Sequence, residues 1–554
     1  MNQSPTPRSF TDFWPQWLLA VIFGILWFGA PAYRTLTEPD EGRYAEIPRE
    51  MLVSGDWVVP HLNGIEYLEK PPLQYWATAT AYQAFGITPW SSRLWSVGLG
   101  FAGLWVVLAI GRAQFGRAAG RYAACVAASC PLYLFIAQIN VLDMGLAFFL
   151  TCGLGCFLQS QRRAPQAYWM WLCWLALSLG FLQKGLVALA LPGLALLLFS
   201  LLQRDFSLWR RLQLLAGLLI VAVVTLPWLL LMEQRSPGFL AFFFVHEHLL
   251  RFATNIHQRV EPWWFFIGVL LVGTLPWWPA IVAGLRSAWR TPQAAAGFAV
   301  ERFLLVWAAT ILLFFSSSSS KLVPYIVPVV APLALLAGAA LARSDVPFGR
   351  WRDLWPVLLL AAICALAPWY LPHNRPEGIV RAAYAAVSQW LLVSGACIAV
   401  GALLTALARR GGRSRAFGMT TLAVALGVGL TLIICSTNAI EPVRGGPSDS
   451  AAFASYLRAN TPLYCIGLYP QTVIFALRRS CILVEYHGEL MTELPGGTEH
   501  WIPTLDGFAA RWSQQADAVA IVDPDAFRKL RARGVALQAI AANQVAVLAV
   551  HPQR

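Results

Sequence analysis

The chain has 554 residues, of which 58% are hydrophobic and 12% charged, and its net charge is +13. Soluble domains are only about 45–50% apolar, so this composition excludes an ordinary soluble protein and indicates a polytopic membrane protein. The ten cysteines do not form a disulfide framework, because eight of them fall in apolar runs, where cysteine packs as a small hydrophobe. Only Cys465 and Cys481 lie in a polar region, where they could form a disulfide.

Thirteen apolar stretches are predicted to cross the bilayer, which takes about 20 residues per helix. The first is too long for a signal peptide and is predicted to be a retained span. In chain order the spans lie near 15–33, 91–111, 120–138, 142–160, 168–183, 186–203, 212–232, 263–285, 301–316, 322–342, 354–371, 385–408 and 417–436.

The apolar segment 71–86 is a fourteenth candidate, and positive charge decides against it. Without it, eighteen arginines in six alternate loops face one side of the membrane, which is the pattern of cytoplasmic loops. We therefore predict an interfacial helix at 71–86, with Tyr75 and Trp76 as surface anchors, a cytoplasmic N-terminus and a C-terminus outside. The arginines are Arg112, Arg117, Arg121, Arg162, Arg163, Arg204, Arg210, Arg211, Arg286, Arg290, Arg302, Arg343, Arg350, Arg352, Arg409, Arg410, Arg413 and Arg415.

The first outer loop, residues 34–90, contains the stretch "EPDEGRYAEIPREM" at 38–51, half of which is charged. Its apolar residues Tyr44, Ile47 and Met51 recur at helical spacing, so we expect a short helix lying along the membrane. Asp40 follows Pro39, where an N-cap would stand. Asp40 and Glu41 therefore either cap the helix and favour its positive end, or take part in chemistry.

Three cations stand at the outer ends of apolar segments: Lys70, Arg251 and Lys321. Each alone could be a snorkelling anchor. Together with the carboxylates of the first outer loop they indicate a pocket for an anionic lipid headgroup. Asp143 begins the fourth span from the outer side, where a carboxylate either faces a polar cavity or caps the helix.

The motif "HEH" at 246–248 is not a metalloprotease signature. On a helix the two histidines point to different faces, whereas an extended segment would place both on one face. His246, His248 and Glu69 could then hold zinc; otherwise the histidines serve as hydrogen-bonding groups. No other cofactor is predicted.

Residues 438–554 alternate helical and strand patterns, as in "PLYCIGLY", "CILVEY" and "AVAIVDPDAFRKLRARG". We predict a small α/β domain outside the membrane, following a transmembrane domain at 1–437. It has no glycine-rich phosphate loop and no nucleophile elbow, so no chemistry is assigned to it.

Several stretches resemble a known family. An acidic pair in the first outer loop, an interfacial helix that begins with Pro-Pro and an outer soluble domain are similar to GT-C glycosyltransferases, which include the protein O-mannosyltransferases. The closer resemblance is to bacterial aminoarabinose (4-amino-4-deoxy-L-arabinose) lipid A transferases. It is carried by "DEGRYAEIPREMLVSGDWVVPHLNGIEYLEKPPLQYW" (40–76), "EHLLRF" (247–252) and "SKLVPYIVP" (320–328). His246 departs from the apolar residue expected before "EH".

The resemblance implies transfer of aminoarabinose from undecaprenyl phosphate to a phosphate of lipid A, which confers resistance to polymyxin and cationic antimicrobial peptides. It implies a monomer in the inner membrane, with the active site facing the periplasm. Undecaprenyl phosphate-linked aminoarabinose, lipid A and membrane lipids are the expected partners, and no nucleic acid is expected.

The chemistry suggests roles for the polar residues. Asp40, Glu41 and Asp143 are the predicted catalytic carboxylates. A leaving lipid phosphate needs cations to neutralise its developing charge. The predicted phosphate ligands are Lys70, Arg43, Arg251, Lys321 and the phenol of Tyr325.

Two other functions remain open from the sequence. A lipid-linked sugar transferase could act on protein or another glycan. A transporter of lipid-linked precursors would place its polar groups near the midplane and show paired halves, whereas here they gather at the outer interface and no repeat is visible.

Overall fold

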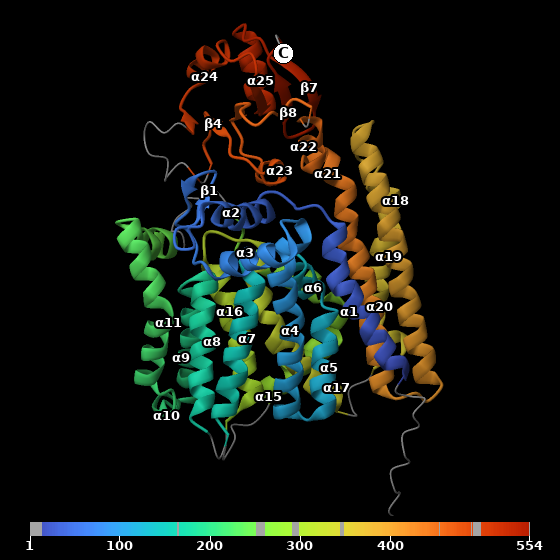
Figure 1. Ribbon diagram of the computed structural model, residues 1–554. Coiled ribbons are helices and arrows are strands. Elements are labelled where there is room, and N and C mark those ends of the chain that lie inside the picture. Colours follow the sequence, from blue (N-terminus) through green and yellow to red (C-terminus); the bar gives the residue numbers. More distant parts are fainter. Residues whose placement is uncertain are drawn as a thin grey trace, which may run out of the picture.

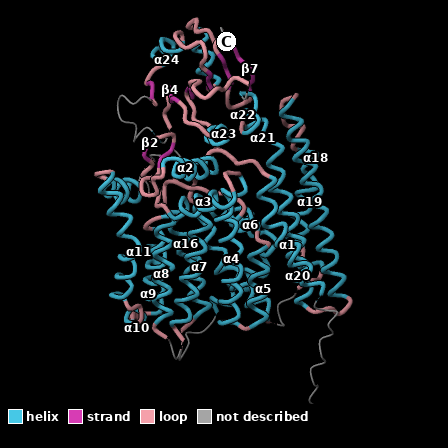
Figure 2. Tube along the Cα trace, in the orientation of Figure 1, coloured by secondary structure: helices cyan, strands magenta, loops and turns pink. Residues whose placement is uncertain are grey.

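The computed structural model describes residues 14–162, 166–250, 261–290, 298–343, 348–453, 455–488, 490 and 500–552. Figure 1 shows a bundle of long helices with a small α/β layer above one end, and two short helices lie between them. The strands are confined to this upper part, as Figure 2 shows. The predicted fold class, a helical polytopic membrane protein with an added α/β domain, is therefore confirmed.

Each predicted span coincides with one helix or with two or three consecutive helical elements. Eight helices of the described residues are long and apolar enough to cross a membrane, or nine if α5 and α6, bent by 65°, form one span. The other predicted spans fall on shorter helices, so the count of thirteen stays a prediction. The helices are α1 (Trp14–Tyr33), α4 (Pro89–Phe115), α5 (Arg117–Ala128), α6 (Pro131–Ala137), α7 (Leu142–Ser160), α8 (Tyr168–Lys184), α9 (Val187–Gln203), α10 (Ser207–Arg210), α11 (Leu214–Arg235), α12 (Phe239–Ala241), the π-helix η2 (Phe242–Leu250), α14 (Phe265–Thr274), the 3₁₀ helix η3 (Leu275–Trp277), α15 (Trp278–Arg290), α16 (Val300–Ser317), the 3₁₀ helix η4 (Val323–Val329), α17 (Val330–Ala342), the 3₁₀ helix η5 (Trp351–Asp353), α18 (Trp355–Tyr370), α19 (Ile379–Arg410) and α20 (Arg415–Cys435).

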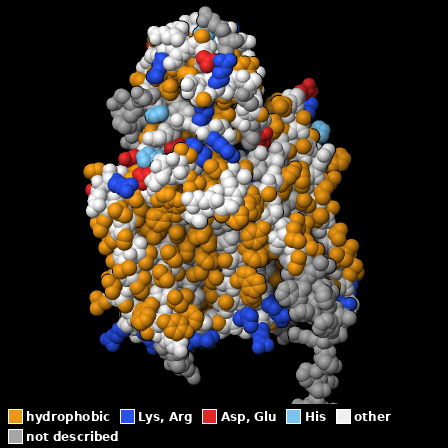
Figure 3. All heavy atoms as spheres, in the orientation of Figure 1, with side chains coloured by type: hydrophobic (Ala, Val, Ile, Leu, Met, Phe, Trp, Pro, Cys, Tyr) orange, Lys and Arg blue, Asp and Glu red, His pale blue; other side chains and the backbone are white. Residues whose placement is uncertain are grey.

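The surface of the bundle is apolar around its middle. Figure 3 shows hydrophobic side chains over the bundle and lysine and arginine side chains along its lower end, opposite the α/β layer. Leu215, Leu219 and Val223 of α11 are more than half exposed, which is costly in water but favourable against lipid. The arginine-rich loops therefore lie at one end of the bundle and the C-terminal layer at the other, as the charge pattern predicts.

Two helices of the first outer loop, α2 (Asp40–Ser54) and α3 (Leu73–Phe85), lie across the bundle (Figure 1). Between them, β1 (His61–Leu62) and β2 (Ile65–Glu66) form a small hairpin. Its turn is Asn63-Gly64, and both residues have positive φ (58° and 73°), as a two-residue turn that matches strand twist requires. The prediction that 71–86 does not span is consistent with this position of α3.

Two expectations for α2 are wrong. Asp40 is the first residue of the helix and not its N-cap, because Pro39 precedes it and no side chain caps the helix. The helix does not lie on the membrane surface either. Its apolar residues Tyr44, Ile47 and Met51 pack in one cluster with residues of the C-terminal sheet. The helix is therefore enclosed between α3 and the α/β layer, which supplies the apolar surface that membrane lipid was expected to supply.

The C-terminal layer is a six-stranded sheet of order β5-β4-β3-β6-β8-β7. The strands β5, β4, β3 and β6 are parallel, while β8 pairs antiparallel with both β6 and β7. One face packs towards α2 and α23, and the other packs on α24 and α25. The elements are the 3₁₀ helix η6 (Ser436–Ile440), α21 (Glu441–Arg444), α22 (Pro447–Phe453), β3 (Leu463–Ile466), α23 (Gln471–Leu477), β4 (Ile482–Val484), β5 (Trp501–Ile502), α24 (Leu505–Trp512), β6 (Val519–Val522), α25 (Pro524–Ala532), β7 (Gln538–Ala542) and β8 (Val547–Val550).

Cys465 and Cys481 lie in this sheet region as buried free thiols. The disulfide that the sequence allowed is therefore not formed in this structure.

Candidate active site

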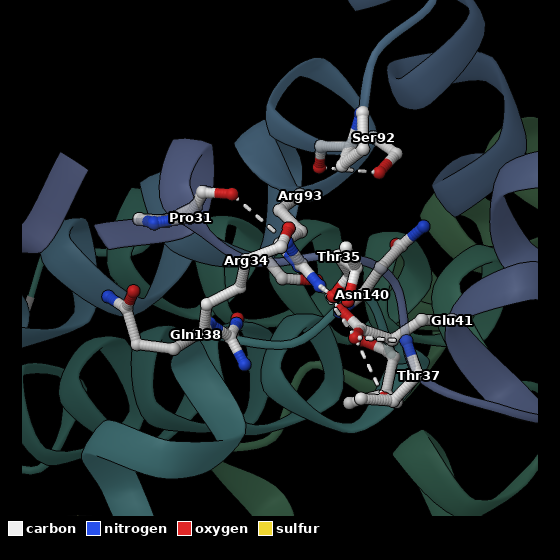
Figure 4. Close-up of polar contacts among 12 residues, drawn as sticks. Pro31, Arg34, Thr35, Thr37, Glu41, Ser92, Arg93, Gln138 and Asn140 are labelled. Atoms are coloured by element: carbon white, nitrogen blue, oxygen red, sulfur yellow. Dashed lines mark hydrogen bonds and ion pairs between the residues drawn. The ribbon is translucent and has the colours of Figure 1, made fainter. Parts of the chain in front are cut away.

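The beginning of α2 is held by a buried ion pair, shown in Figure 4. The Arg93 guanidinium, from α4, donates to both carboxylate oxygens of Glu41 at 2.6 and 2.8 Å. It also donates to three backbone carbonyls of the segment that leads from α1 into α2, those of Pro31, Arg34 and Thr35. One arginine therefore fixes the path of the chain immediately before Asp40.

The Glu41 carboxylate has no exposed oxygen left for substrate. Besides Arg93 it accepts hydrogen bonds from the backbone N–H and hydroxyl of Thr37 and from the backbone N–H of Asn140. Burial alone would raise the pKa of Glu41, but the Arg93 ion pair and these donors lower it to about 2. The sequence placed Glu41 among the catalytic groups. Its surroundings are those of a positioning residue, which stabilises the start of α2.

Asp40 begins a chain of polar contacts across the outer end of the bundle. Its carboxylate is about one-third exposed and lies 3.6 Å from the Arg43 guanidinium. Arg43 donates to the Tyr67 hydroxyl at 3.5 Å, and that hydroxyl donates to Glu69 at 3.0 Å. Glu69 contacts the Lys70 ammonium at 3.3 Å. The structure therefore brings together Asp40, Arg43, Glu69 and Lys70, four residues that the sequence proposed as site residues.

Lys70 has a second carboxylate partner that the sequence analysis did not consider. Glu247, in the π-helix η2, lies 2.7 Å from the Lys70 ammonium, and its side chain is only 2% exposed. Two carboxylates around one lysine hold the ammonium in a fixed position and offset its charge, so a phosphate would bind Lys70 by displacing one of these acceptors.

A second cluster surrounds Asp143 at the start of α7. Its carboxylate is ion-paired with the Lys184 ammonium, at the end of α8. The same ammonium lies 4.5 Å from the centre of the Tyr325 ring, a cation–π contact. Asp143 makes no capping hydrogen bond, so of the two alternatives the polar environment is the one observed.

Tyr44 connects the two clusters. Its side chain is buried, and burial raises the pKa of its phenol well above the ordinary value; nearby Asp40, Glu69 and Asp143 raise it further, while Arg43 opposes them. The phenol therefore stays protonated. Tyr44 packs in one apolar cluster with Tyr67, which bonds Glu69, and with Leu142, which precedes Asp143. These neighbours define one candidate site of Asp40, Lys70 and Asp143, the Asp40–Asp143 centre.

A buried amide network supports this centre from below. Gln183 of α8 donates to Gln74 of α3 at 2.8 Å, and Gln74 donates to Asn140 at 2.7 Å. Trp95 of α4 donates to Gln183 at 3.1 Å. Both glutamines are fully buried, so each lost bond would leave a polar group unsatisfied. The network therefore fixes Lys184, the residue after Gln183, relative to α3 and α4.

Lys321 lies at the turn between α16 and η4. Its ammonium is buried and donates to the backbone carbonyls of Ser318, at 2.6 Å, and Glu261, at 3.0 Å. These bonds leave one N–H and the positive charge, so the role of Lys321 as a phosphate ligand stays a prediction.

Two of the three predicted zinc ligands, Glu69 and His246, have described side chains. Glu69 is engaged by Lys70 and Tyr67, and the His246 ring stacks on Phe242 with 4.9 Å between ring centres. No group of three metal-ligating side chains is assembled among the residues that the structure describes. The side chain of His248 and the whole of Arg251 lie outside the described residues.

Lys184, Glu247 and Arg93 are the residues that sequence reasoning missed. Lys184 had a signal of its own, since "FLQKG" ends an apolar span on the outer side, as Lys70 and Lys321 border theirs. Glu247 stands inside the "HEH" motif, between two histidines that are the more conspicuous metal ligands. Nothing in the sequence marks Arg93 as the partner of Glu41, because 52 residues separate them.

Two family models match the chain. Residues 14–243 match the dolichyl-phosphate-mannose-protein mannosyltransferase model, and residues 450–551 match the aminoarabinose transferase C-terminal domain. The second match lies on the α/β layer and the first on the part of the bundle that carries α2, α3 and Lys184.

Curated relatives carry one common name. The chain is 32% identical over 500 residues to undecaprenyl phosphate-alpha-4-amino-4-deoxy-L-arabinose arabinosyl transferase of Erwinia tasmaniensis, covering 85% of this chain and 86% of that protein. It is 38% identical over 327 residues to transferase 1 of Sodalis glossinidius and 36% identical over 355 residues to transferase 2; these alignments span only 58% and 63% of the relatives' length.

A solved structure matches almost the whole chain. The crystal structure of ArnT from Cupriavidus metallidurans bound to undecaprenyl phosphate superposes with a TM-score of 0.88 at 31% identity, and 98% of each chain is covered. Its apo state matches equally well.

Proposed function

The chain belongs to the family of undecaprenyl phosphate-aminoarabinose arabinosyl transferases, and we propose that it transfers 4-amino-4-deoxy-L-arabinose from undecaprenyl phosphate to a phosphate of lipid A. The observation that carries this proposal is the Asp40–Asp143 centre, where carboxylates and cations from α2, α7, α8 and the 67–70 segment meet at one end of an apolar bundle.

The charges of the centre suit this donor. Among the described residues it contains the cations Arg43, Lys70 and Lys184 and the carboxylates Asp40, Glu69, Asp143 and Glu247. An excess of carboxylate is unfavourable for a purely anionic ligand, but it complements a sugar that carries an ammonium. The donor has both charges, a phosphate for the cations and an amino group for a carboxylate.

The transfer needs little acid–base chemistry. The bond between the sugar's anomeric carbon and the undecaprenyl phosphate oxygen breaks, and its electron pair leaves with the phosphate. An anionic oxygen of the lipid A phosphate forms the new bond, so no proton has to be removed from the acceptor. Lys70 is our first choice for neutralising the leaving phosphate, with the Tyr325 hydroxyl and Arg251 as further ligands.

The carboxylates then act by position and charge. Asp40 is the most exposed of the carboxylates that form the centre's ion pairs, which fits a group that touches substrate. We assign to Asp40 the stabilisation of the positive charge that develops on the sugar ring, and to Asp143 the binding of the sugar's amino group. A strong base would be required only if the acceptor were a hydroxyl.

The orientation follows from charge. If the arginine-rich loops face the cytoplasm, as positive loops commonly do, the centre and the α/β layer would lie on the periplasmic face of the inner membrane. Adding a cationic sugar to a lipid A phosphate lowers the negative charge of the outer surface, so polymyxin and other cationic peptides would bind it less.

The test is mass spectrometry of lipid A from a host that makes the donor but lacks its own transferase. With this protein expressed, we expect additions of the mass of aminoarabinose, and none with an empty vector. Unmodified lipid A despite a folded protein would refute the proposed acceptor. Modified envelope proteins or other glycans in the same cells would then identify a different lipid-linked transferase, the class to which the mannosyltransferase model belongs.

A further inference from the structure

A groove of about 220 Å³ lies on the side of the bundle, between α1, α4, α5 and α20 and far from the Asp40–Asp143 centre. Its walls are apolar apart from Cys125 and Thr420, and the Thr420 hydroxyl is bonded to the carbonyl of Ala416 in its own helix. Trp105, at the rim, is 61% exposed. An apolar groove on a surface that faces lipid can bind a hydrocarbon chain.

Two arginines, Arg112 and Arg121, lie beyond the lining residues of the groove, towards the end of the bundle that carries the arginine-rich loops. On α4 the lining residues Leu104, Trp105 and Leu108 follow helical spacing, and Arg112 continues the same stripe one turn further. On α5, Arg121 precedes the lining residue Cys125 by one turn.

The two arginines come from helices in close contact. The backbone of Gly120, next to Arg121, approaches Arg112 so closely that a Cβ on Gly120 would lie 2.6 Å from the Arg112 side chain. Both arginines are exposed. Among the described residues, neither guanidinium has a hydrogen-bond or ion-pair partner.

The dimensions match one leaflet. The stripe on α4 runs from Phe101 to Arg112, which is twelve residues, and their eleven rises of 1.5 Å span about 16 Å. Half of a hydrocarbon core about 30 Å thick is about 15 Å. A chain lying along this stripe would therefore reach the bilayer centre with its headgroup beside the arginines. A helix of another protein, about 10 Å across, is too wide for a groove of this volume.

We propose that this groove binds an anionic phospholipid of the leaflet at the arginine-rich end, with one acyl chain in the groove and its phosphate between Arg112 and Arg121. Basic pockets between helices on the cytoplasmic side of membrane proteins suit such headgroups. The lipid would hold α1 and α20 against α4 and α5. This site takes neither donor nor acceptor and is independent of the transfer reaction.

The experiment is native mass spectrometry of the full-length protein, delipidated and then titrated with phosphatidylglycerol or phosphatidylethanolamine of identical acyl chains. We expect preferential retention of phosphatidylglycerol. Each basic side chain near a membrane surface contributes about fivefold in affinity, so Arg112→Gln with Arg121→Gln should weaken phosphatidylglycerol binding about 30-fold. Phosphatidylethanolamine, whose ammonium offsets the charge of its phosphate, should be weakened much less. Filling the groove with Ala124→Leu should weaken both lipids alike.

Arg210→Gln with Arg211→Gln is the matched control, because these arginines are exposed at the same end of the bundle but belong to α10 and the residue after it. Equal retention of the two lipids by the wild type would overturn the proposal. So would an equal loss of phosphatidylglycerol in the control variant, or a dimer whose formation the Ala124→Leu variant abolishes, since the groove would then seat a second copy of the chain.

Discussion

The Glu41–Arg93 ion pair gives the sharpest test of how the site is built. If Glu41 only positions α2, Glu41→Gln should lower the free energy of unfolding and leave the rate of sugar transfer nearly unchanged. If Glu41 is a catalytic carboxylate, the same substitution should lower the rate. The shift of the Glu41 pKa from 4.5 to about 2 corresponds to about 3 kcal/mol of stability. Breaking a buried pair by removing one partner typically costs about 3–5 kcal/mol, so the two magnitudes agree.

The measurement is the free energy of unfolding in mixed micelles, beside the steady-state rate of sugar transfer per folded molecule. We expect Glu41→Gln and Arg93→Gln each to lose about 3 kcal/mol, and the double variant to lose much less than the sum. The single amide oxygen that Glu41→Gln introduces can accept either from Thr37, which donates to Oε2, or from Asn140, which donates to Oε1, but not from both. Because neither oxygen is left for substrate, kcat should stay within about tenfold of the wild type.

The pH dependence provides a second reading of the same pair. A lowered pKa stabilises the folded state fully above the unfolded value near 4.5, and this contribution is lost as pH falls towards about 2. Glu41→Gln should remove this acid sensitivity. Native stability together with a loss of more than about 100-fold in kcat would refute the reasoning and make Glu41 a catalytic residue.

Three further outcomes are expected. Lys184→Gln leaves Asp143 without its ion-pair partner, so sugar transfer should fall about 100-fold in a steady-state assay, with partial recovery in Lys184→Arg. Burial of its carboxylate raises the pKa of Glu38 to about 7, although two hydrogen bonds from Thr472 oppose this shift. Between pH 4.5 and 7 the folded state therefore holds a proton that the unfolded state has released. The free energy of unfolding should fall as pH rises through this range. Hydrogen exchange at the Thr472 amide should therefore accelerate between pH 5 and 8 by more than the intrinsic pH effect, and in Glu38→Gln it should not. Removal of divalent metal by a chelator should leave transfer unchanged, because Glu69 is already engaged by a lysine and a tyrosine.

Each of these has an outcome that would contradict it. Full activity of Lys184→Gln at normal expression would exclude Lys184 from the site. The same acceleration of exchange in Glu38→Gln would assign it to another group. A chelated protein that loses activity and regains it with zinc would restore the metal role of Glu69, His246 and His248.

The sequence was sufficient for the fold class because membrane insertion depends on local quantities. Apolar length predicts where helices form, and the arginine-rich loops predict their direction, while the count of thirteen spans stays a prediction. The same argument identified 71–86 as a helix that does not span, and Figure 1 shows α3 lying across the bundle. The position of α2 could not be predicted this way, since its apolar stripe fits a membrane surface as well as the C-terminal sheet that covers it.

The site was predictable only in part, for a related reason. Asp40, Lys70 and Asp143 could be found because a charge beside an apolar segment is conspicuous. Which residues form ion pairs depends on how the helices pack. The sequence therefore could not show that Asp143 pairs with Lys184 or Lys70 with Glu247. Nor could the sequence show that Lys321 bonds two backbone carbonyls at a turn, because a cation in a turn looks the same in sequence as one that binds phosphate.

The central claim is that the Asp40–Asp143 centre transfers the amino sugar to lipid A. The most direct test uses purified wild type, Asp40→Asn and Glu66→Gln with undecaprenyl phosphate-linked aminoarabinose and lipid A, followed by mass spectrometry of the product. Glu66 is an exposed carboxylate of the same outer loop. We expect modified lipid A from the wild type and from Glu66→Gln, and a loss of at least about 100-fold from folded Asp40→Asn. Equal product from all three would contradict the account.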